Sequence, residues 1–157
     1  MKLLELNTAL VNLLRDNVPN PHTSGQWIYI SYPRMDATFP RISVTQILGS
    51  LSPIGIGEYS TSSSKSMLAT VEYDIDIWVK RTNRFTYEST TYVGTKLRDF
   101  LAEKVIQTLI EKKQELKENY EIIDVEVVGF SSHPLDEEYE LHRKTITIRV
   151  TFEWEKT

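Results

Sequence analysis

The most regular pattern in the chain is the alternation of apolar and polar residues over residues 67–80. Every second residue there is apolar: Met67, Ala69, Val71, Tyr73, Ile75, Ile77 and Val79. Successive side chains of a β-strand point to opposite faces of the sheet, so a period of two predicts a strand with one buried face. Residues 39–48 alternate in the same way, and we expect the two segments to form a long hairpin.

Three further segments have the texture of strands. Residues 27–30 are rich in β-branched and aromatic side chains and predict a short strand. Residues 122–130 and 139–155 alternate again, and the polar stretch 131–138 separates them. The last segment carries no proline, and we see no sign of a bulge in it. We therefore expect an open sheet edge there, which a neighbouring subunit could cover through head-to-tail contacts.

Two stretches instead carry apolar residues at the three- and four-residue spacing of an amphipathic helix. In residues 2–16 the stripe is Leu3, Leu6, Leu10, Leu13 and Leu14. In residues 89–119 it is Val93, Leu97, Phe100, Leu101, Val105, Leu109 and Ile110. The first helix should end before Pro19, which cannot continue it. The second is expected to be one long helix whose polar last turns project beyond the core or fray.

The order of these elements predicts an α+β fold. A sheet with one face packed on the core and the other exposed to solvent has strands that alternate regularly between apolar and polar residues, which is typical of antiparallel sheets. We therefore expect a mostly antiparallel sheet of four to five strands, with the long helix and the N-terminal helix packed on one face. The chain shows neither an internal repeat nor a linker, so residues 1–157 are expected to form a single domain.

The segment 49–66, GSLSPIGIGEYSTSSSKS, interrupts the alternation between the two long strands. Its glycines, proline and Ser/Thr run predict a long mobile hairpin loop, and loops beyond about 12–15 residues are often functional or disordered. Four apolar residues lie among its small polar ones and are candidates for a partner-binding or assembly contact: Leu51, Ile54, Ile56 and Tyr59. The alternative is a plain mobile hairpin tip.

Glu72, Asp74 and Asp76 share the polar face of the strand at 67–80. Grouped carboxylates can serve acid–base chemistry or bind a hard cation, but the outer face of a half-buried strand is also normally charged. We favour a solvated or subunit-facing surface. The three histidines, His22, His133 and His142, lack the spacing of a metal-binding pair, and no phosphate-binding loop or nucleophile motif is present. We predict no catalytic residue, metal or cofactor.

Composition narrows the class of protein further. A net charge of -4 and an isoelectric point near 5.4 argue against a dedicated nucleic-acid binder, which usually carries a basic surface. The chain has no cysteine, which excludes disulfides and thiolate metal sites. No segment approaches the ~20 apolar residues of a membrane span, and the first residues do not resemble a signal peptide, so a cytosolic product is expected.

The succession of FPRISVTQ, a Gly/Ser-rich gap, YDIDIWVK, a long helix and a closing HRKTITIRVTFEW strand resembles the tail-completion or tail-terminator proteins of tailed viruses, and related neck proteins. The resemblance covers nearly the whole chain and rests on element order and strand texture. It implies a structural subunit that forms a ring, commonly a hexamer, which caps the tail tube and joins it to the head. The implied partners are further copies of the chain, the tail-tube protein and a head-closure or connector protein.

The resemblance also implies a place for each candidate surface. The loop 49–66 would reach a neighbouring subunit or the tube. Glu72, Asp74 and Asp76 would face a channel through which DNA passes without specific binding. Such a protein is made in the host cytoplasm, resides in the tail or neck of the virion, and has no membrane contact. Two alternatives remain: a non-viral oligomeric adaptor or scaffold, and a small metal-dependent hydrolase that uses Glu72, Asp74 and a histidine.

Overall fold

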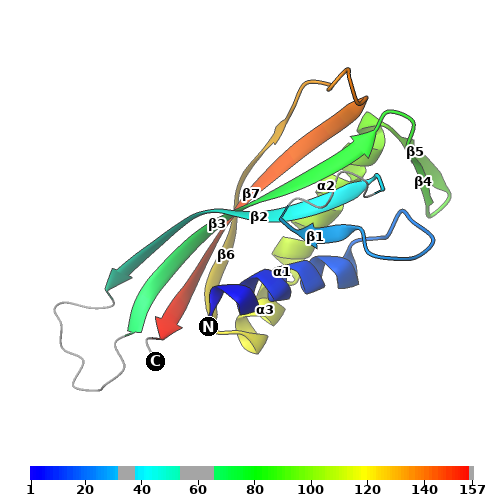
Figure 1. The fold of residues 1–157 in the computed structure, drawn as a ribbon. Helices are drawn as coiled ribbons and strands as arrows, with labels where there is room; N and C mark the ends of the chain where they lie inside the picture. The colour runs from blue at the N-terminus through cyan, green and yellow to red at the C-terminus, as the bar shows by residue number, and fades with distance from the viewer. Residues whose placement is uncertain (32–37, 54–65, 156–157) are drawn as a thin grey trace.

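The alternating segments form one five-stranded sheet in the order β1-β2-β3-β7-β6 (Figure 1). The structure, a computed structural model, describes residues 1–31, 38–53 and 66–155. Its elements are α1 (Leu3–Asn17), β1 (Ile28–Ile30), β2 (Arg41–Pro53), β3 (Ser66–Lys80), β4 (Arg84–Tyr87), β5 (Thr90–Val93), α2 (Thr95–Glu111), α3 (Lys113–Asn119), β6 (Ile122–Ser132) and β7 (Leu141–Glu155). β1 is parallel to β2, and the other neighbours in the sheet are antiparallel. The predicted α+β fold with a mostly antiparallel sheet is confirmed.

The predicted hairpin of the two long strands is also confirmed, but it is longer than expected. Ile42 lies opposite Ile77, and the ladder continues until Pro53 lies opposite Met67. The prediction that a loop begins at residue 49 is therefore wrong by five residues, because residues 49–53 pair with the regular β3 despite their Gly, Ser and Pro content. Residues 54–65 of the predicted loop lie outside the described residues.

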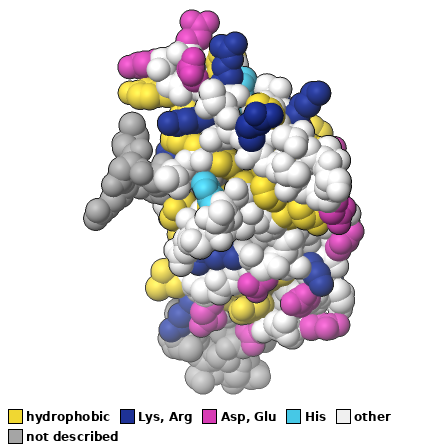
Figure 2. All heavy atoms as spheres, turned by 90° about the vertical axis from the view of Figure 1, so that its right-hand side faces the viewer, with side chains coloured by type: hydrophobic (Ala, Val, Ile, Leu, Met, Phe, Trp, Pro, Cys, Tyr) yellow, Lys and Arg dark blue, Asp and Glu magenta, His cyan; other side chains and the backbone are white. Residues whose placement is uncertain are grey.

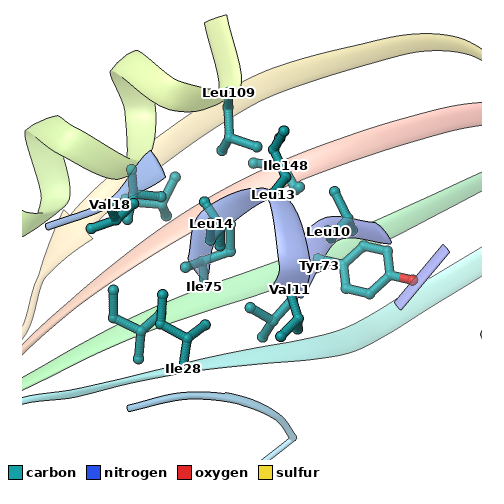
Figure 3. Close-up of a cluster of buried hydrophobic side chains, with 14 of the residues drawn as sticks. Leu10, Val11, Leu13, Leu14, Val18, Ile28, Tyr73, Ile75, Leu109 and Ile148 are labelled. Atoms are coloured by element: carbon teal, nitrogen blue, oxygen red, sulfur yellow. The ribbon is translucent and has the colours of Figure 1, made fainter. Parts of the chain in front are cut away.

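The helices cover the apolar face of the sheet, as expected. Leu6, Leu10 and Leu14 of α1 are fully buried against this face. Figure 3 places Leu10 and Leu14 beside Tyr73 and Ile75 of β3, with Ile148 of β7 and Leu109 of α2 close by. Burying a leucine side chain contributes roughly 1.5–3 kcal/mol, so this stripe is a main source of the stability that holds α1 in place.

Arg15 joins the end of α1 to the edge strand β1. Its guanidinium donates to the carbonyl of Ile28 from Nε at 3.1 Å and from a terminal nitrogen at 2.7 Å. Next to it, the N–H of Val18 donates to the carbonyl of Leu14 at 2.8 Å, and Val18 itself is extended, so the helix ends there. A basic residue in the last turn also interacts favourably with the helix dipole.

The helix predicted over residues 89–119 begins later, because residues 84–93 form a separate hairpin. Glu88 and Ser89 adopt φ of 48° and 70°, the left-handed backbone that a tight hairpin turn requires, and β4 then pairs with β5. Gly94, with φ 58°, separates β5 from α2, and a Cβ there would lie 3.1 Å from the carbonyl oxygen of Arg81. Val93, assigned above to the helix stripe, is instead 38% exposed in β5.

The same helix is interrupted at Lys112, where α2 ends and α3 begins after one residue with φ -98° and ψ 6°. The expectation that the last polar turns project or fray is wrong. Leu116, the single leucine of α3, is 2% exposed in the hydrophobic core, and Lys113 forms an ion pair with Asp124 of β6. One buried leucine and one ion pair therefore hold a short helix that its composition alone would not stabilise.

Candidate assembly surfaces: the polar face and the sheet edges

The predicted acidic row lies on the face of the sheet opposite the helices. Each residue of the row has a cross-strand partner on β7. In the antiparallel ladder of β3 and β7, Glu72 lies opposite Arg149, Asp74 opposite Thr147 and Asp76 opposite Thr145. We call this surface the polar face. The ladder places a hydroxyl or a guanidinium directly across from each carboxylate, which is the arrangement that stabilises neighbouring strands.

Asp76 is the centre of the polar face and is 0% exposed. Its Oδ1 accepts hydrogen bonds from Nε of Arg143 at 2.9 Å and from the hydroxyl of Thr145 at 2.5 Å. The guanidinium of Arg143 also lies 4.6 Å from the ring centroid of Trp78. His133 Nε2 lies 2.7 Å from the same Thr145 hydroxyl. A buried carboxylate requires such partners, since an uncompensated charge inside a protein is costly.

The other two carboxylates of the row are partly exposed and are also engaged. Thr147 donates its hydroxyl hydrogen to Asp74 at 2.8 Å. Arg149 donates to Glu72 at 2.9 Å and lies 3.6 Å from Glu126 of β6. The row therefore does not present three free negative charges, because each carboxylate is bound across the ladder.

The histidines do not come together. His22 lies 2.7 Å from the carbonyl oxygen of Pro40, and His133 contacts Thr145 on the polar face. Burial and then the positive charges of Arg98 and Arg81 lower the pKa of His142. Within the described residues, no three side chains of the metal-ligating types are grouped closely enough to hold an ion. The hydrolase alternative named Glu72 and Asp74 with a histidine, whereas the carboxylate that His133 reaches through Thr145 is Asp76.

The four loop candidates are only partly placed. Leu51 lies in β2 and is 52% exposed. Ile54, Ile56 and Tyr59 lie outside the described residues. The predicted mobility of the loop concerns the same segment and stays a prediction. Leu51 is therefore part of a strand rather than of a loop, and it belongs to a larger exposed surface on the edge of the sheet.

Among the described strands, the sheet has two long open edges, and neither belongs to β7. The prediction of an open edge at residues 139–155 is wrong, because β7 lies between β3 and β6. One open edge is β2: β1 pairs only with Ile42–Val44, and within the described chain no strand pairs with its outer side from Thr45 to Pro53. The other is β6, the last strand in the order. In Figure 1, the far ends of β2, β3 and β7 extend away from α2.

Both open edges carry apolar side chains that water reaches. On β2 these are Ile47, Leu48 and Leu51, at 49%, 61% and 52% exposure, and on β6 they are Ile123, Val128 and Phe130, at 47%, 46% and 65%. Of these six residues, only Leu51 was predicted from the sequence. Four of the others could have been noticed because two apolar residues stand side by side at 47–48, 122–123 and 127–128, which breaks the alternation of apolar and polar residues.

A smaller apolar surface lies on α2. Ile106 and Ile110 are one helical turn apart and line a shallow hollow with Glu103, Gln107 and Glu111. Elsewhere the charges are mixed: on the face shown in Figure 2, acidic and basic side chains of the described residues are interspersed. Interspersed charges give no strong field of one sign, which is consistent with the modest net charge of -4.

The fold and its surfaces define an α+β protein whose exposed features are sheet edges and a polar ladder. A comparison with protein-family models and with curated protein sequences finds no match to this chain. Among the described helices, none has the length and apolar character that crossing a membrane would need.

Proposed function

We propose that this chain is a structural subunit of an oligomeric ring, of the kind that terminates the tail tube of a tailed virus and joins the tail to the head. The observation that carries the proposal is the pair of open sheet edges with exposed apolar side chains. Natural monomers usually blunt such edges with charged residues or proline, because an open edge pairs with other chains. The free part of β2 before Pro53 carries no charged residue, and on β6 Asp124 and Glu126 are paired with cations of their own chain, so both edges offer apolar side chains for assembly.

The polar face supports a structural rather than a catalytic role for the acidic row. Glu72, Asp74 and Asp76 each bind a side chain of β7, and the fully buried Asp76 is held by two donors. A carboxylate that serves as a general base must reach a proton on a substrate, whereas these three are occupied in joining β3 to β7.

In the proposed assembly the partners are further copies of this chain in a ring, commonly six, with the tail-tube protein on one side and a head-closure or connector protein on the other. DNA passes through the ring without specific binding. Assembly takes place in the host cytoplasm and ends in the tail or neck of the virion. The sequence resemblance supplies these partners, and the open edges supply a physical means of forming the ring.

The proposal is tested by light scattering and negative-stain electron microscopy of the purified chain, alone and with tubes of the tail-tube protein. We expect rings in solution or on the ends of tubes, and we expect tube growth to stop where a ring has bound. A chain that stays monomeric and ignores tube ends would refute the proposal. The alternative of a non-viral scaffold predicts an oligomer that forms alone and leaves tube growth unchanged.

A further inference from the structure

Three β-bulges interrupt the two open edges, and each bulge carries a β-branched apolar residue. The register of β2 and β3 skips Ile47, and the register of β6 and β7 skips Ile123 and Val128. These three side chains are exposed to almost the same degree, 49%, 47% and 46%. A bulge gives one strand an extra residue that has no cross-strand partner. A bulge by itself tends to discourage pairing, because it twists an edge strand away from a partner. Here, however, each bulge leaves a large apolar side chain in water, and it is these side chains that point to a surface that becomes covered.

The charges on the two edges disfavour one of the possible pairings. The free part of β2, from Thr45 to Pro53, contains no charged residue. β6 contains Asp124 and Glu126, which are ion-paired to Lys113 and Arg149 of their own chain. Pairing β6 with β6 of a second copy would bring carboxylates of two chains into one ladder, which is unfavourable to the extent that Lys113 and Arg149 leave their charge uncompensated. Pairing β6 with β2 of a second copy places the carboxylates beside an uncharged strand.

Strand direction permits the pairing of β6 with β2 of a second copy in a head-to-tail arrangement. Because β2, β3, β7 and β6 alternate in direction, β6 runs antiparallel to β2 within the sheet. A second copy placed beside β6 in the same orientation therefore continues the antiparallel ladder with its β2. The nine residues from Thr45 to Pro53 span about 30 Å at ~3.4 Å per residue. A ladder of this length is sufficient to align two subunits.

We propose that the outer edge of β2 in one copy pairs with the outer edge of β6 in the next copy, and that Ile47, Ile123 and Val128 become buried in this contact. The contact is head-to-tail, so it uses different surfaces on the two chains and can close into a ring. Its use in a ring rests on the proposed function, whereas the strand pairing is a claim about the two edges alone.

Two edge variants test the pairing. The β2-edge variant carries Ile47→Lys and Leu51→Lys, and the β6-edge variant carries Ile123→Lys and Val128→Lys. The matched control is Ile110→Lys, which makes the same chemical change at a 64% exposed residue on α2. Circular dichroism and thermal melting establish that each variant is folded. If the β2-edge variant does not fold, Leu48→Lys replaces it, since Leu48 is 61% exposed and lies opposite Glu72.

Sedimentation velocity and native mass spectrometry of each variant, and of a 1:1 mixture, give the decisive result. Each edge variant alone should be monomeric, because one half of its head-to-tail contact is blocked. The mixture should form a 1:1 heterodimer that grows no further, since one intact β2 edge meets one intact β6 edge. Ile110→Lys should assemble like the wild type. In the mixture, the amides of residues 45–52 that point to the outer side of β2 should become protected from hydrogen exchange only in the β6-edge variant, because its β2 edge is the intact one.

Several results would overturn the pairing. A β6-edge variant that dimerises alone would instead indicate a symmetric β2–β2 contact. Edge variants that assemble like the wild type, or a wild type that stays monomeric at its highest soluble concentration, would also refute it. The proposed function fails separately: if the heterodimer forms but wild-type rings leave tube ends open, the strand pairing stands and the tail-terminator role does not.

Discussion

Asp76→Asn tests whether the buried centre of the polar face holds β3 and β7 together. The carboxylate is 0% exposed and accepts from Arg143 at 2.9 Å and from the Thr145 hydroxyl. Asparagine has almost the same size, so packing is preserved, but the negative charge facing Arg143 is removed. The other carboxylate oxygen, Oδ2, is buried and has no hydrogen-bond partner within the described part of the chain.

The magnitude follows from burial. A hydrogen bond to a charged group contributes about 1.5–3 kcal/mol, and removing one member of a buried ion pair costs about 3–5 kcal/mol. The side chain of Arg143 is 29% exposed, so water compensates part of the loss. We therefore expect Asp76→Asn to lower the free energy of unfolding by about 2–3 kcal/mol.

Glu72→Gln is the matched control, because it also removes one carboxylate charge from the same row. The ion pair of Glu72 with Arg149 has the same 2.9 Å separation, but the two side chains are 22% and 40% exposed. Exposed ion pairs contribute about 0.2–1 kcal/mol, so the control should lose less than ~1 kcal/mol. The two variants differ in burial and not in the charge removed.

Urea unfolding at neutral pH, at one protein concentration and with the slope of the transition compared between variants, measures both losses. Thermal melting gives a second readout, in which Asp76→Asn should lower the midpoint by about 4–12 °C at ~2–4 °C per kcal/mol. Equal losses in the two variants would show that burial does not set the cost. An Asp76→Asn protein as stable as the wild type would show that the ion pair contributes nothing.

Three further predictions concern the core, the acid limit of stability and the β4–β5 hairpin. Leu14→Ala should lower the free energy of unfolding by about 2–5 kcal/mol, while Leu4→Ala, at a 79% exposed residue of the same helix, should change it by less than ~0.5 kcal/mol in urea titrations. Burial raises the pKa of Asp99, but hydrogen bonds from Lys144 and Arg98 outweigh it and the pKa is lowered. Its contribution is present above the ordinary carboxyl pKa and lost as the pH falls through the lowered value, so Asp99→Asn should reduce the slope of stability against pH in acid unfolding curves. Tyr92 stacks on Phe100 at 4.1 Å, so Tyr92→Ala should speed amide hydrogen exchange in β4 and β5 far more than in β3 or β7.

The long strands were predictable because their apolar period is undisturbed. From Ala69 to Val79 every second side chain is buried, and one residue of slippage would turn all of them toward water. The same reasoning failed at residues 49–53, where Gly, Ser and Pro suggested a loop. Those residues are strand because β3 offers a regular ladder opposite them, and this is a tertiary effect that local composition does not contain.

The edges were harder to predict because strand order is not a local property. Nothing within residues 139–155 indicates that β3 and β6 flank them on both sides. The bulges, in contrast, left a trace in the sequence. Each of the pairs Ile47-Leu48, Ile122-Ile123 and Val127-Val128 breaks the period of two, and in each pair one residue is skipped by the register. An apolar pair inside an alternating strand is a usable sign of a bulge.

The ion pairs and hydrogen bonds of the acidic row also reduce the negative charge that the proposed channel would present to DNA. A surface repels a polyanion through charges that are not already compensated nearby. Glu72 and Asp76 lie against guanidinium groups at 2.9 Å, and so the polar face has little free negative charge to offer. The turn between β6 and β7 differs, because Asp136, Glu137, Glu138 and Glu140 are all exposed there. In a ring built from these subunits, charge reversal in this turn should therefore alter the passage or sticking of DNA more than a change at Glu72, whose charge is already paired with Arg149.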